Sequence, residues 1–117
     1  MMVAIYCRAN DESVLDMQEK CIRTGTEMAG IASSQTLLFS DIGGTGTSID
    51  RPGMNKLRAA LREEDIECVF VWGSDRIATQ YDQLALFLRE AQDEGVKVYA
   101  ICTGQPEDLA WMLSLGK

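Results

Sequence analysis

The feature that most restricts the fold of this sequence is a regular alternation between short apolar runs and longer segments with a helical hydrophobic period. The apolar runs lie at residues 3–7, 36–39, 66–72 and 96–102. The third run is apolar without alternation, which is typical of a strand that is covered on both faces. This order predicts an α/β domain of three layers, α/β/α, with a mainly parallel sheet of four to five strands and right-handed crossovers.

Helices are expected between these runs at residues 10–30, 52–61 and 81–95, followed by a last short helix from residue 106. Asn10 or Asp11 would cap the first helix, and Pro52 suits the first turn of the second because its missing N–H needs no partner there. Glu107 and Asp108 suit the positive end of the last helix dipole. Residues 40–50 are too rich in glycine and hydroxyls for regular structure. We expect a loop there, with residues 41–51 the most mobile segment.

The charge balance restricts what the domain can bind. The 117 residues suffice for one domain with a hydrophobic core, and the net charge is -7 with a pI near 4.5. These values argue against a surface dedicated to nucleic acid, which needs clustered Lys and Arg, but leave room for a few arginines in one cleft. No apolar run reaches the roughly 20 residues that cross a bilayer. A cytoplasmic protein with no membrane partner is therefore expected.

The residue types present disfavour disulfides and a metal site. Histidine, the commonest metal ligand and general base, is missing from the sequence. The cysteines Cys7, Cys21, Cys68 and Cys102 have no CxxC spacing, and three of them lie in apolar strand-like runs, which indicates buried reduced thiols. Cys7 is expected in the core with a raised pKa rather than as a nucleophile. We expect no metal and no cofactor, so catalysis would use Arg, Asp, Glu, Ser, Thr, Tyr or Cys.

Polar residues that could form a site follow the ends of the first three strands. Arg8 and Asn10 come after the first strand, Asp41 and the glycine-rich loop after the second, and Asp75 and Arg76 after the third. Because the carboxyl ends of parallel strands meet at one edge of a sheet, we expect these groups near one another. Arginines from different strands suit a phosphate or another oxyanion. The alternative is a structural ion pair between Asp75 and either Arg8 or Arg76.

Three motifs together resemble the catalytic domain of the serine recombinases, the resolvase and invertase family. They are Tyr6-Cys7-Arg8-Ala9-Asn10, residues 41–53 (DIGGTGTSIDRPG) and Val71-Trp72-Gly73-Ser74-Asp75-Arg76-Ile77. The family pattern is roughly Tyr-x-Arg-Val-Ser, Asp-x-Gly-x-Ser-Gly-Thr-Ser-x-Asp-Arg-Pro-Gly and Asp-Arg-Leu-Ser-Arg. The motifs occur in the family's order and span nearly the whole chain, and the middle one is long enough to be distinctive.

The resemblance implies DNA strand exchange in which a serine attacks a phosphodiester without metal and forms a phosphoserine link. In the family, an arginine cluster stabilises the charge that builds up on the phosphate oxygens. By resemblance, that cluster contains Arg8, Arg51 and Arg76. Asp75 would orient it, and Asp41 would support the site at the DNA phosphate.

The sequence departs from the family pattern at the nucleophile. The serine falls on Asn10, which has no hydroxyl, and neither of its immediate neighbours has one. Ser13 is expected in the first helical turn, and its use as a substitute nucleophile would need a rebuilt loop. The last arginine of the third motif falls on Thr79, and the serine of the glycine-rich loop has become Thr45.

These departures lead to two functional hypotheses. The first is a single resolvase-like catalytic domain over residues 1–117, without the family's C-terminal DNA-binding domain or long dimer helix, which no longer cleaves DNA but keeps an anion-binding cleft. DNA is its partner by resemblance. The second is a protein-interaction module that forms homo-oligomers, or binds and regulates an active recombinase or another basic partner, which the acidic charge suits. A further interpretation is the front part of a longer recombinase.

Overall fold

The computed structural model describes residues 2–43, 47–102 and 106–116 and confirms the expected α/β architecture. The strands are β1 (Met2–Ala9), β2 (Thr36–Ile42), β3 (Ile66–Val71), β4 (Lys97–Ala100) and β5 (Glu107–Asp108). The α-helices are α1 (Glu12–Met28), α2 (Pro52–Glu63), α3 (Ser74–Ile77) and α4 (Tyr81–Asp93). Two 3₁₀ helices, η1 (Ser33–Gln35) and η2 (Leu109–Gly116), complete the described part of the chain.

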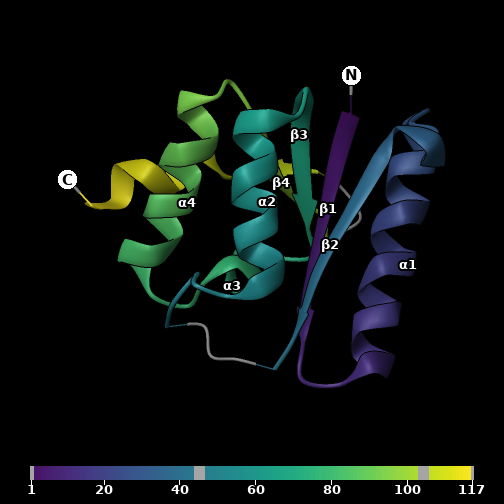
Figure 1. Ribbon diagram of the computed structural model, residues 1–117, viewed down its shortest axis with the longest axis horizontal. Coiled ribbons are helices and arrows are strands. Elements are labelled where there is room, and N and C mark those ends of the chain that lie inside the picture. Colours follow the sequence, from purple (N-terminus) through teal and green to yellow (C-terminus); the bar gives the residue numbers. More distant parts are fainter. Residues whose placement is uncertain (1, 44–46, 103–105, 117) are drawn as a thin grey trace.

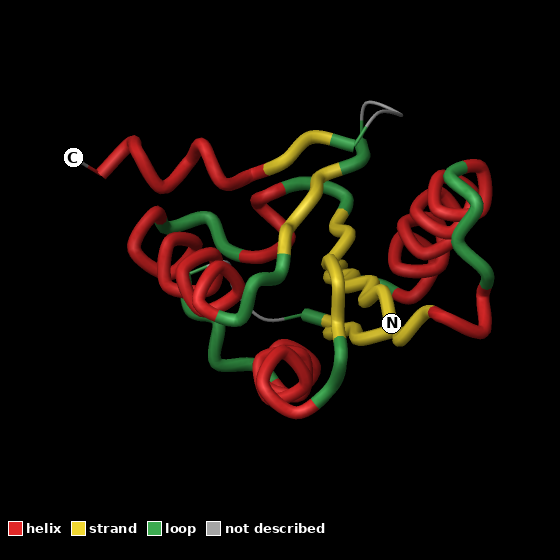
Figure 2. Tube along the Cα trace, turned by 90° about the horizontal axis from the view of Figure 1, so that it is seen from above, coloured by secondary structure: helices red, strands yellow, loops and turns green. Residues whose placement is uncertain are grey.

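The sheet has the strand order β2-β1-β3-β4-β5. Strands β1 to β4 run parallel, and β5 is antiparallel to β4. Helix α1 covers one face of the sheet and α2 and α4 cover the other, as Figure 1 and the view from above in Figure 2 show. The chain leaves β1 in one direction to form β2 and returns on the other side of β1 to form β3. The strand order therefore reverses between β1 and β3, where open α/β sheets bind ligands.

Local signals in the sequence determine where the helices begin and end. Asp11 is the N-cap of α1, and its carboxylate accepts the N–H of Val14 at 3.0 Å. After α1 the chain turns at Gly30, whose φ of 85° suits only glycine without strain, and the N–H of Ile31 bonds back to the carbonyl of Thr26 at 3.0 Å. Capping residues and glycine thus end the helix close to the expected positions.

Two apolar layers hold the sheet between its helices. One layer packs α2 and α4 against the sheet and includes Tyr6, Leu57 and Phe87, all with no exposed surface. The other packs α1 against the opposite face and includes Ile5 and Ile22. Because side chains alternate along a strand, even-numbered residues of β1 face α2 and odd-numbered residues face α1. The described part of the chain contains no helix long and apolar enough to span a membrane.

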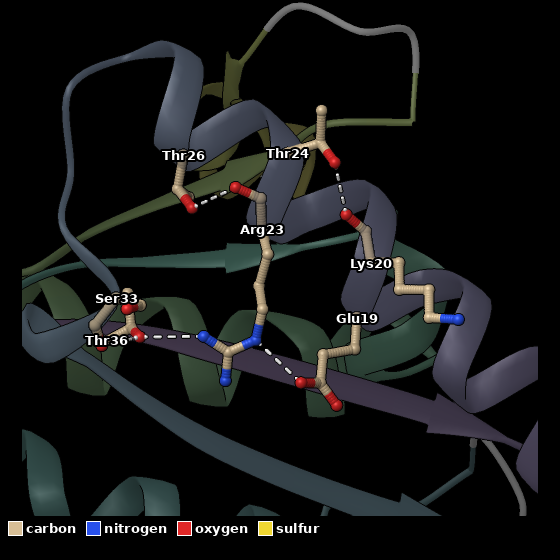
Figure 3. A network of polar contacts seen from close by, with 7 residues as sticks. All are labelled: Glu19, Lys20, Arg23, Thr24, Thr26, Ser33 and Thr36. Carbon is tan, nitrogen blue, oxygen red and sulfur yellow. Dashed lines mark hydrogen bonds and ion pairs between the residues drawn. The ribbon is translucent and has the colours of Figure 1, made fainter.

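A polar network fixes α1 to the start of the edge strand β2, and Figure 3 shows its contacts. Arg23 donates from Nε to Glu19 at 2.7 Å and from Nη1 to the hydroxyl of Thr36 at 3.1 Å. The Thr36 hydroxyl in turn donates to the carbonyl of Ser33 at 2.7 Å. These bonds hold the C-terminal half of α1 in place over the sheet.

The second strand is longer than the sequence predicts. β2 continues to Ile42, so Ser40 and Asp41 belong to the strand and not to the following loop. The reason is that Asp41 is buried beneath α2, where its carboxylate has hydrogen-bond partners. The mobility expected for residues 41–51 falls in part on Gly44, Thr45 and Gly46, which lie outside the described residues.

The end of the chain also differs from the expected helix. Glu107 and Asp108 pair with Ala100 and Tyr99 of β4 as a short antiparallel strand, and helical turns begin only at Leu109. Pairing satisfies backbone groups along the open side of β4, which outweighs the preference of acidic residues for a helix N-terminus. The helix α3 was not expected either, because four residues are too few to show a hydrophobic period.

The cysteines are free, but only two of them are buried. Cys7 and Cys68 lie inside the sheet layers, and burial raises the pKa of Cys7 to about 12 and that of Cys68 to about 11. Cys7 is therefore an inert core residue, as expected. The expectation of burial is wrong for Cys21 on α1 and for Cys102 just after β4, whose side chains are exposed.

Candidate functional site

The candidate site lies at the carboxyl ends of β1, β2 and β3, beside the helix α3. In Figure 1 these strand ends and α3 are at the bottom of the molecule, next to the start of α2. The side chains of Arg8, Arg51 and Arg76 come together here, from β1, from the residue before α2 and from α3. We call these residues the arginine cluster.

Side chains of the arginine cluster donate hydrogen bonds to backbone carbonyls of α3. Arg8 donates from Nε to the carbonyl of Arg76 at 3.1 Å and from Nη2 to the carbonyl of Asp75 at 2.9 Å. Arg51 donates from Nη2 to the carbonyl of Ile77. Arg76 in turn donates from Nη1 to the carbonyl of Arg8 at 3.4 Å. The carbonyls of residues 75–77 thus accept hydrogen bonds from side chains on two other elements.

No ion pair balances the charge of the arginine cluster within the described residues. Its guanidinium groups form no ion pair with any described carboxylate, and the described ion pairs lie elsewhere. Burial lowers the pKa of Arg8, the charges of Arg51 and Arg76 lower it further, and the charge of Asp75 acts in the opposite direction. Within the described chain, three buried donors have no hydrogen-bond partner: Nε and Nη1 of Arg51 and Nε of Arg76. Concentrated positive charge with unused N–H groups is suited to an oxyanion.

Asp75 does not form the structural ion pair that was the alternative reading of this site. Its side chain is exposed, and no ion pair with Arg8 or Arg76 is present among the described residues. Its backbone carbonyl, not its carboxylate, accepts the bond from Arg8. The carboxylate folds back over Gly73, where a Cβ would lie 2.9 Å from Asp75 Oδ1.

Asp41 supports the cluster by fixing the start of α2. Its Oδ2 accepts the hydroxyl of Tyr6 at 2.7 Å and the N–H of Met54 at 2.9 Å, and its Oδ1 accepts the N–H of Gly53 at 2.7 Å. The N-cap residue, Arg51, makes no capping bond with its side chain, so Asp41 of β2 caps α2 in its place.

Arg51 and Tyr6 pack against each other above this carboxylate. The Arg51 guanidinium carbon lies 5.8 Å from the centre of the Tyr6 ring, a cation–π geometry, and only 6% of the Arg51 surface is exposed. Burial raises the pKa of the Tyr6 hydroxyl well above its usual range, and the hydrogen bond to Asp41 raises it further. The hydroxyl therefore stays protonated and keeps donating to Asp41.

Gln18 belongs to this site, although the sequence did not single it out. The side chain of this α1 residue is fully buried; its Nε2 donates to the carbonyl of Arg8 at 2.9 Å, and its Oε1 accepts the N–H of Arg8 at 3.3 Å. The pairing of β1 with β3 stops at Tyr6 and Val71, so Gln18 takes the place of a neighbouring strand for Arg8. The available signal was a polar residue on the apolar face of α1, one turn before Ile22.

The position that resemblance assigns to the nucleophile is open to solvent. Asn10 follows β1 two residues after Arg8, is exposed, and makes no side-chain hydrogen bond within the described chain. Ser13 lies in the first turn of α1, as expected, and its hydroxyl donates to Asp11 at 2.6 Å. That bond is the main cause of the lowered pKa of Asp11. Thr79 is exposed just beyond α3, and Thr45 lies outside the described residues. No metal-binding group of His, Cys, Asp and Glu side chains occurs in the ranges that the structure describes.

Comparison with known proteins identifies the fold and the family. The family model "Resolvase, N terminal domain" matches residues 3–112. The N-terminal catalytic domain of TP901-1 integrase has 20% identity and a TM-score of 0.77, with 99% of this chain and 88% of that chain covered. A resolvase family site-specific recombinase from Streptococcus pneumoniae has 20% identity and a TM-score of 0.79, with 98% and 82% covered.

A third solved structure is the C-terminal catalytic domain of ISC1926 TnpA, an IS607-like serine recombinase. It has 18% identity and a TM-score of 0.76, with 99% of this chain and 77% of that chain covered. The comparison with curated proteins found no match. At these identities the solved structures show a shared fold, and the match over residues 3–112 shows the family. The resemblance seen in the three motifs is thus confirmed: the chain belongs to the resolvase N-terminal domain family and has the fold of a serine recombinase catalytic domain.

Proposed function

We propose that this domain binds the phosphate of DNA, or a related oxyanion, at the arginine cluster, and that it does not cleave DNA through a phosphoserine link. In this proposal Arg8, Arg51 and Arg76 contact the anion. Asp41 acts on the cluster through the start of α2, and Asp75 acts through its backbone carbonyl, which accepts a bond from Arg8. No cofactor or metal takes part.

The observation that supports anion binding is the set of guanidinium nitrogens without a hydrogen-bond acceptor. Three guanidinium groups converge without a carboxylate partner in the described chain, and three of their N–H-bearing nitrogens are buried without an acceptor. Buried polar groups normally have partners, and each one that lacks an acceptor costs stability. A phosphate offers several charged acceptors at once, and arginine binds it through paired hydrogen bonds.

The proposal that cleavage is lost rests on Asn10. An amide cannot attack phosphorus as an alkoxide does, and losing a nucleophile typically removes several orders of magnitude of rate. The exposed Ser13 lies in the first turn of α1, three residues beyond Asn10, and its use as a nucleophile would need a rebuilt loop. The arginine cluster would then bind a phosphate whose cleavage never starts.

Titration with inorganic phosphate, and then with a short DNA duplex, tests the binding half. We expect phosphate to raise the thermal unfolding midpoint in a concentration-dependent way, because a ligand that binds only the folded state stabilises it. Arg51→Gln should abolish the rise. Arg89→Gln removes the same charge from an exposed position on α4 and should keep it. An equal rise in both variants, or no rise in the wild type, would contradict the proposal.

A second candidate function is favoured by the surface. The net charge is -7, and the edge strand β2 exposes Leu38 at 41% and Ile42 at 54%. An acidic surface suits a basic partner such as a recombinase, and an open apolar edge strand suits a second copy of this chain. A salt-sensitive shift of a DNA duplex supports the first function. Binding of a purified recombinase without DNA binding supports the second.

We also propose that the domain works in the cytoplasm. The exposed thiols of Cys21 and Cys102 fit a reducing compartment, in which free cysteines persist. Fractionation of cells that express the chain, followed by alkylation of free thiols, tests this location. Reduced, alkylatable cysteines in the cytoplasmic fraction are expected.

A further inference from the structure

The structure assigns a moving part to this site, and the inference rests on the proposed function. We infer that residues 73–77, which we call the α3 turn, form a flap that the arginine cluster holds closed and that phosphate binding releases. The guanidinium groups that would bind the anion are the same groups that hold this turn.

An anion cannot reach the unpartnered donors of the arginine cluster in this structure. The unpartnered nitrogens of Arg51 and Arg76 are buried from solvent, and Arg51 as a whole is only 6% exposed. A phosphate oxygen must come within about 3 Å of a donor nitrogen to form a hydrogen bond. An anion therefore reaches these nitrogens only if some neighbouring segment moves aside.

The segment that moves is the α3 turn. The α3 turn contains a single helical turn of four residues, Ser74–Ile77, at whose ends the N–H of Arg76 bonds to the carbonyl of Gly73 and the N–H of Ala78 to that of Ser74, each at 3.1 Å. Arg8 also holds its outer part, through the carbonyls of Asp75 and Arg76.

The two ends of the α3 turn are anchored differently. Ile77 has no exposed surface and is part of the core beneath α4, and Ala78 beside it is 3% exposed. Asp75, in contrast, is exposed to solvent. The backbone of residues 73–76 can therefore swing outward while it stays fixed at Ile77, and the long, flexible side chain of Arg76 keeps its contact with the anion.

Phosphate competes with the backbone carbonyls of the α3 turn for the same N–H groups of Arg8. Arg8 uses Nε and Nη2 on two carbonyls, and this edge of a guanidinium also suits two oxygens of a phosphate. A phosphate oxygen carries a negative charge that a carbonyl lacks, and it can take both N–H groups in one paired contact, so it displaces the carbonyls. Binding then removes the bonds that hold residues 75 and 76.

This mechanism predicts that phosphate speeds up amide exchange in the α3 turn, which is the opposite of the usual effect of a ligand. A bound ligand ordinarily slows amide exchange around its site, because it stabilises the closed structure. Here phosphate should make the amides of Arg76 and Ala78 exchange at least about tenfold faster, the effect expected from the loss of even one of the two hydrogen bonds to Arg8. The amide of Val96, bonded to Ala91 at 2.8 Å at the far end of α4, should not become faster.

The test is residue-resolved hydrogen exchange of the wild-type chain with and without inorganic phosphate, together with its thermal unfolding midpoint. Arg8→Gln should show the fast exchange of Arg76 and Ala78 without phosphate, and Arg89→Gln should behave as the wild type. If Arg8→Gln does not fold, the sign of the change in the wild type decides alone.

The outcomes separate this inference from the proposed function. A raised unfolding midpoint with faster exchange in the α3 turn supports both. A raised midpoint with unchanged or slower exchange in the α3 turn overturns the flap and leaves the proposed function standing. An unchanged midpoint at all phosphate concentrations overturns the proposed function and the flap together.

Discussion

The hydroxyl of Tyr6 in β1 donates a 2.7 Å hydrogen bond to the carboxylate of Asp41 in β2. This bond joins the two strands directly beneath the arginine cluster. The same carboxylate accepts two backbone N–H groups at the start of α2, the helix that immediately follows Arg51. The position of the Arg51 side chain thus depends on the buried carboxylate of Asp41, although no hydrogen bond or ion pair joins the two side chains in the described chain. Several consequences can be measured.

Replacing Tyr6 by Phe should destabilise the domain by about 1–3 kcal/mol, because a buried carboxylate loses one of its donors. Tyr99→Phe is the matched control, since the Tyr99 ring stacks on Phe70 and its hydroxyl has no hydrogen-bond partner in the described ranges. Urea unfolding of both variants measures the difference. Equal effects of the two substitutions would show that the bond to Asp41 contributes nothing.

Gly53 should not tolerate alanine. A Cβ at this position would lie 2.1 Å from the backbone oxygen of Ser40, so the start of α2 would have to move away from β2, at about 1–3 kcal/mol or more. Gly25→Ala is the control, because its Cβ would meet only the movable end of Ile101, at 2.5 Å, and alanine favours the helix. We expect a large loss of unfolding free energy for Gly53→Ala and little change for Gly25→Ala. A similar loss for both would contradict this packing.

Gln18→Leu should cost about 2 kcal/mol, because it leaves the backbone of Arg8 with fewer hydrogen bonds in a buried place. It should also weaken phosphate binding, since Arg8 is no longer held at the end of β1. Gln92→Leu makes the same change at an exposed position of α4 and should be close to neutral. Calorimetric titration with phosphate and urea unfolding check the two effects. A neutral Gln18→Leu variant would remove this residue from the site.

Stability should fall as the pH rises into the alkaline range. The pKa values of Cys7 and Cys68 are about 12 and about 11 in the fold, and burial raises that of Tyr6 as well. In the unfolded chain these groups ionise at about pH 8.5–10. As the pH rises through that range, the unfolded state loses protons that the folded state keeps. The unfolding free energy then falls by up to about 1.4 kcal/mol per pH unit for each group.

Urea unfolding between about pH 7 and about pH 10.5 measures this dependence. Cys7→Ala removes one of the groups and should give a shallower decline, although it lowers stability at neutral pH. Constant or rising stability over this range would contradict the burial of these protonated groups.

Much of this fold could be predicted because its main signals are local. The apolar runs of β1 and β3 are buried on both faces, and Gly30 and Gly95 turn the chain after α1 and α4 with positive φ. The motifs also predicted that Arg8, Arg51 and Arg76 belong together. Their order along the chain reflects which strand ends meet at one edge of the sheet.

The remaining features depend on tertiary contacts that a local pattern does not contain. Asp41 reads as a loop residue, but it is buried in a strand because α2 supplies its N–H partners. Gln18 is a polar residue on the apolar face of α1, but the pattern alone does not reveal that it replaces a strand partner of Arg8. Asp75 reads as an ion-pair partner, yet its carbonyl is the group that Arg8 uses.

The most direct test of this account is a cleavage assay with supercoiled plasmid DNA, at protein concentrations that shift a DNA duplex completely. The reaction is stopped with detergent, and the products are examined for nicked or linear plasmid and for protein attached covalently to DNA. The account predicts that the DNA is bound and stays supercoiled and free of attached protein. Nicked plasmid, or a covalent adduct formed by the wild-type chain with Asn10 in place, would contradict it.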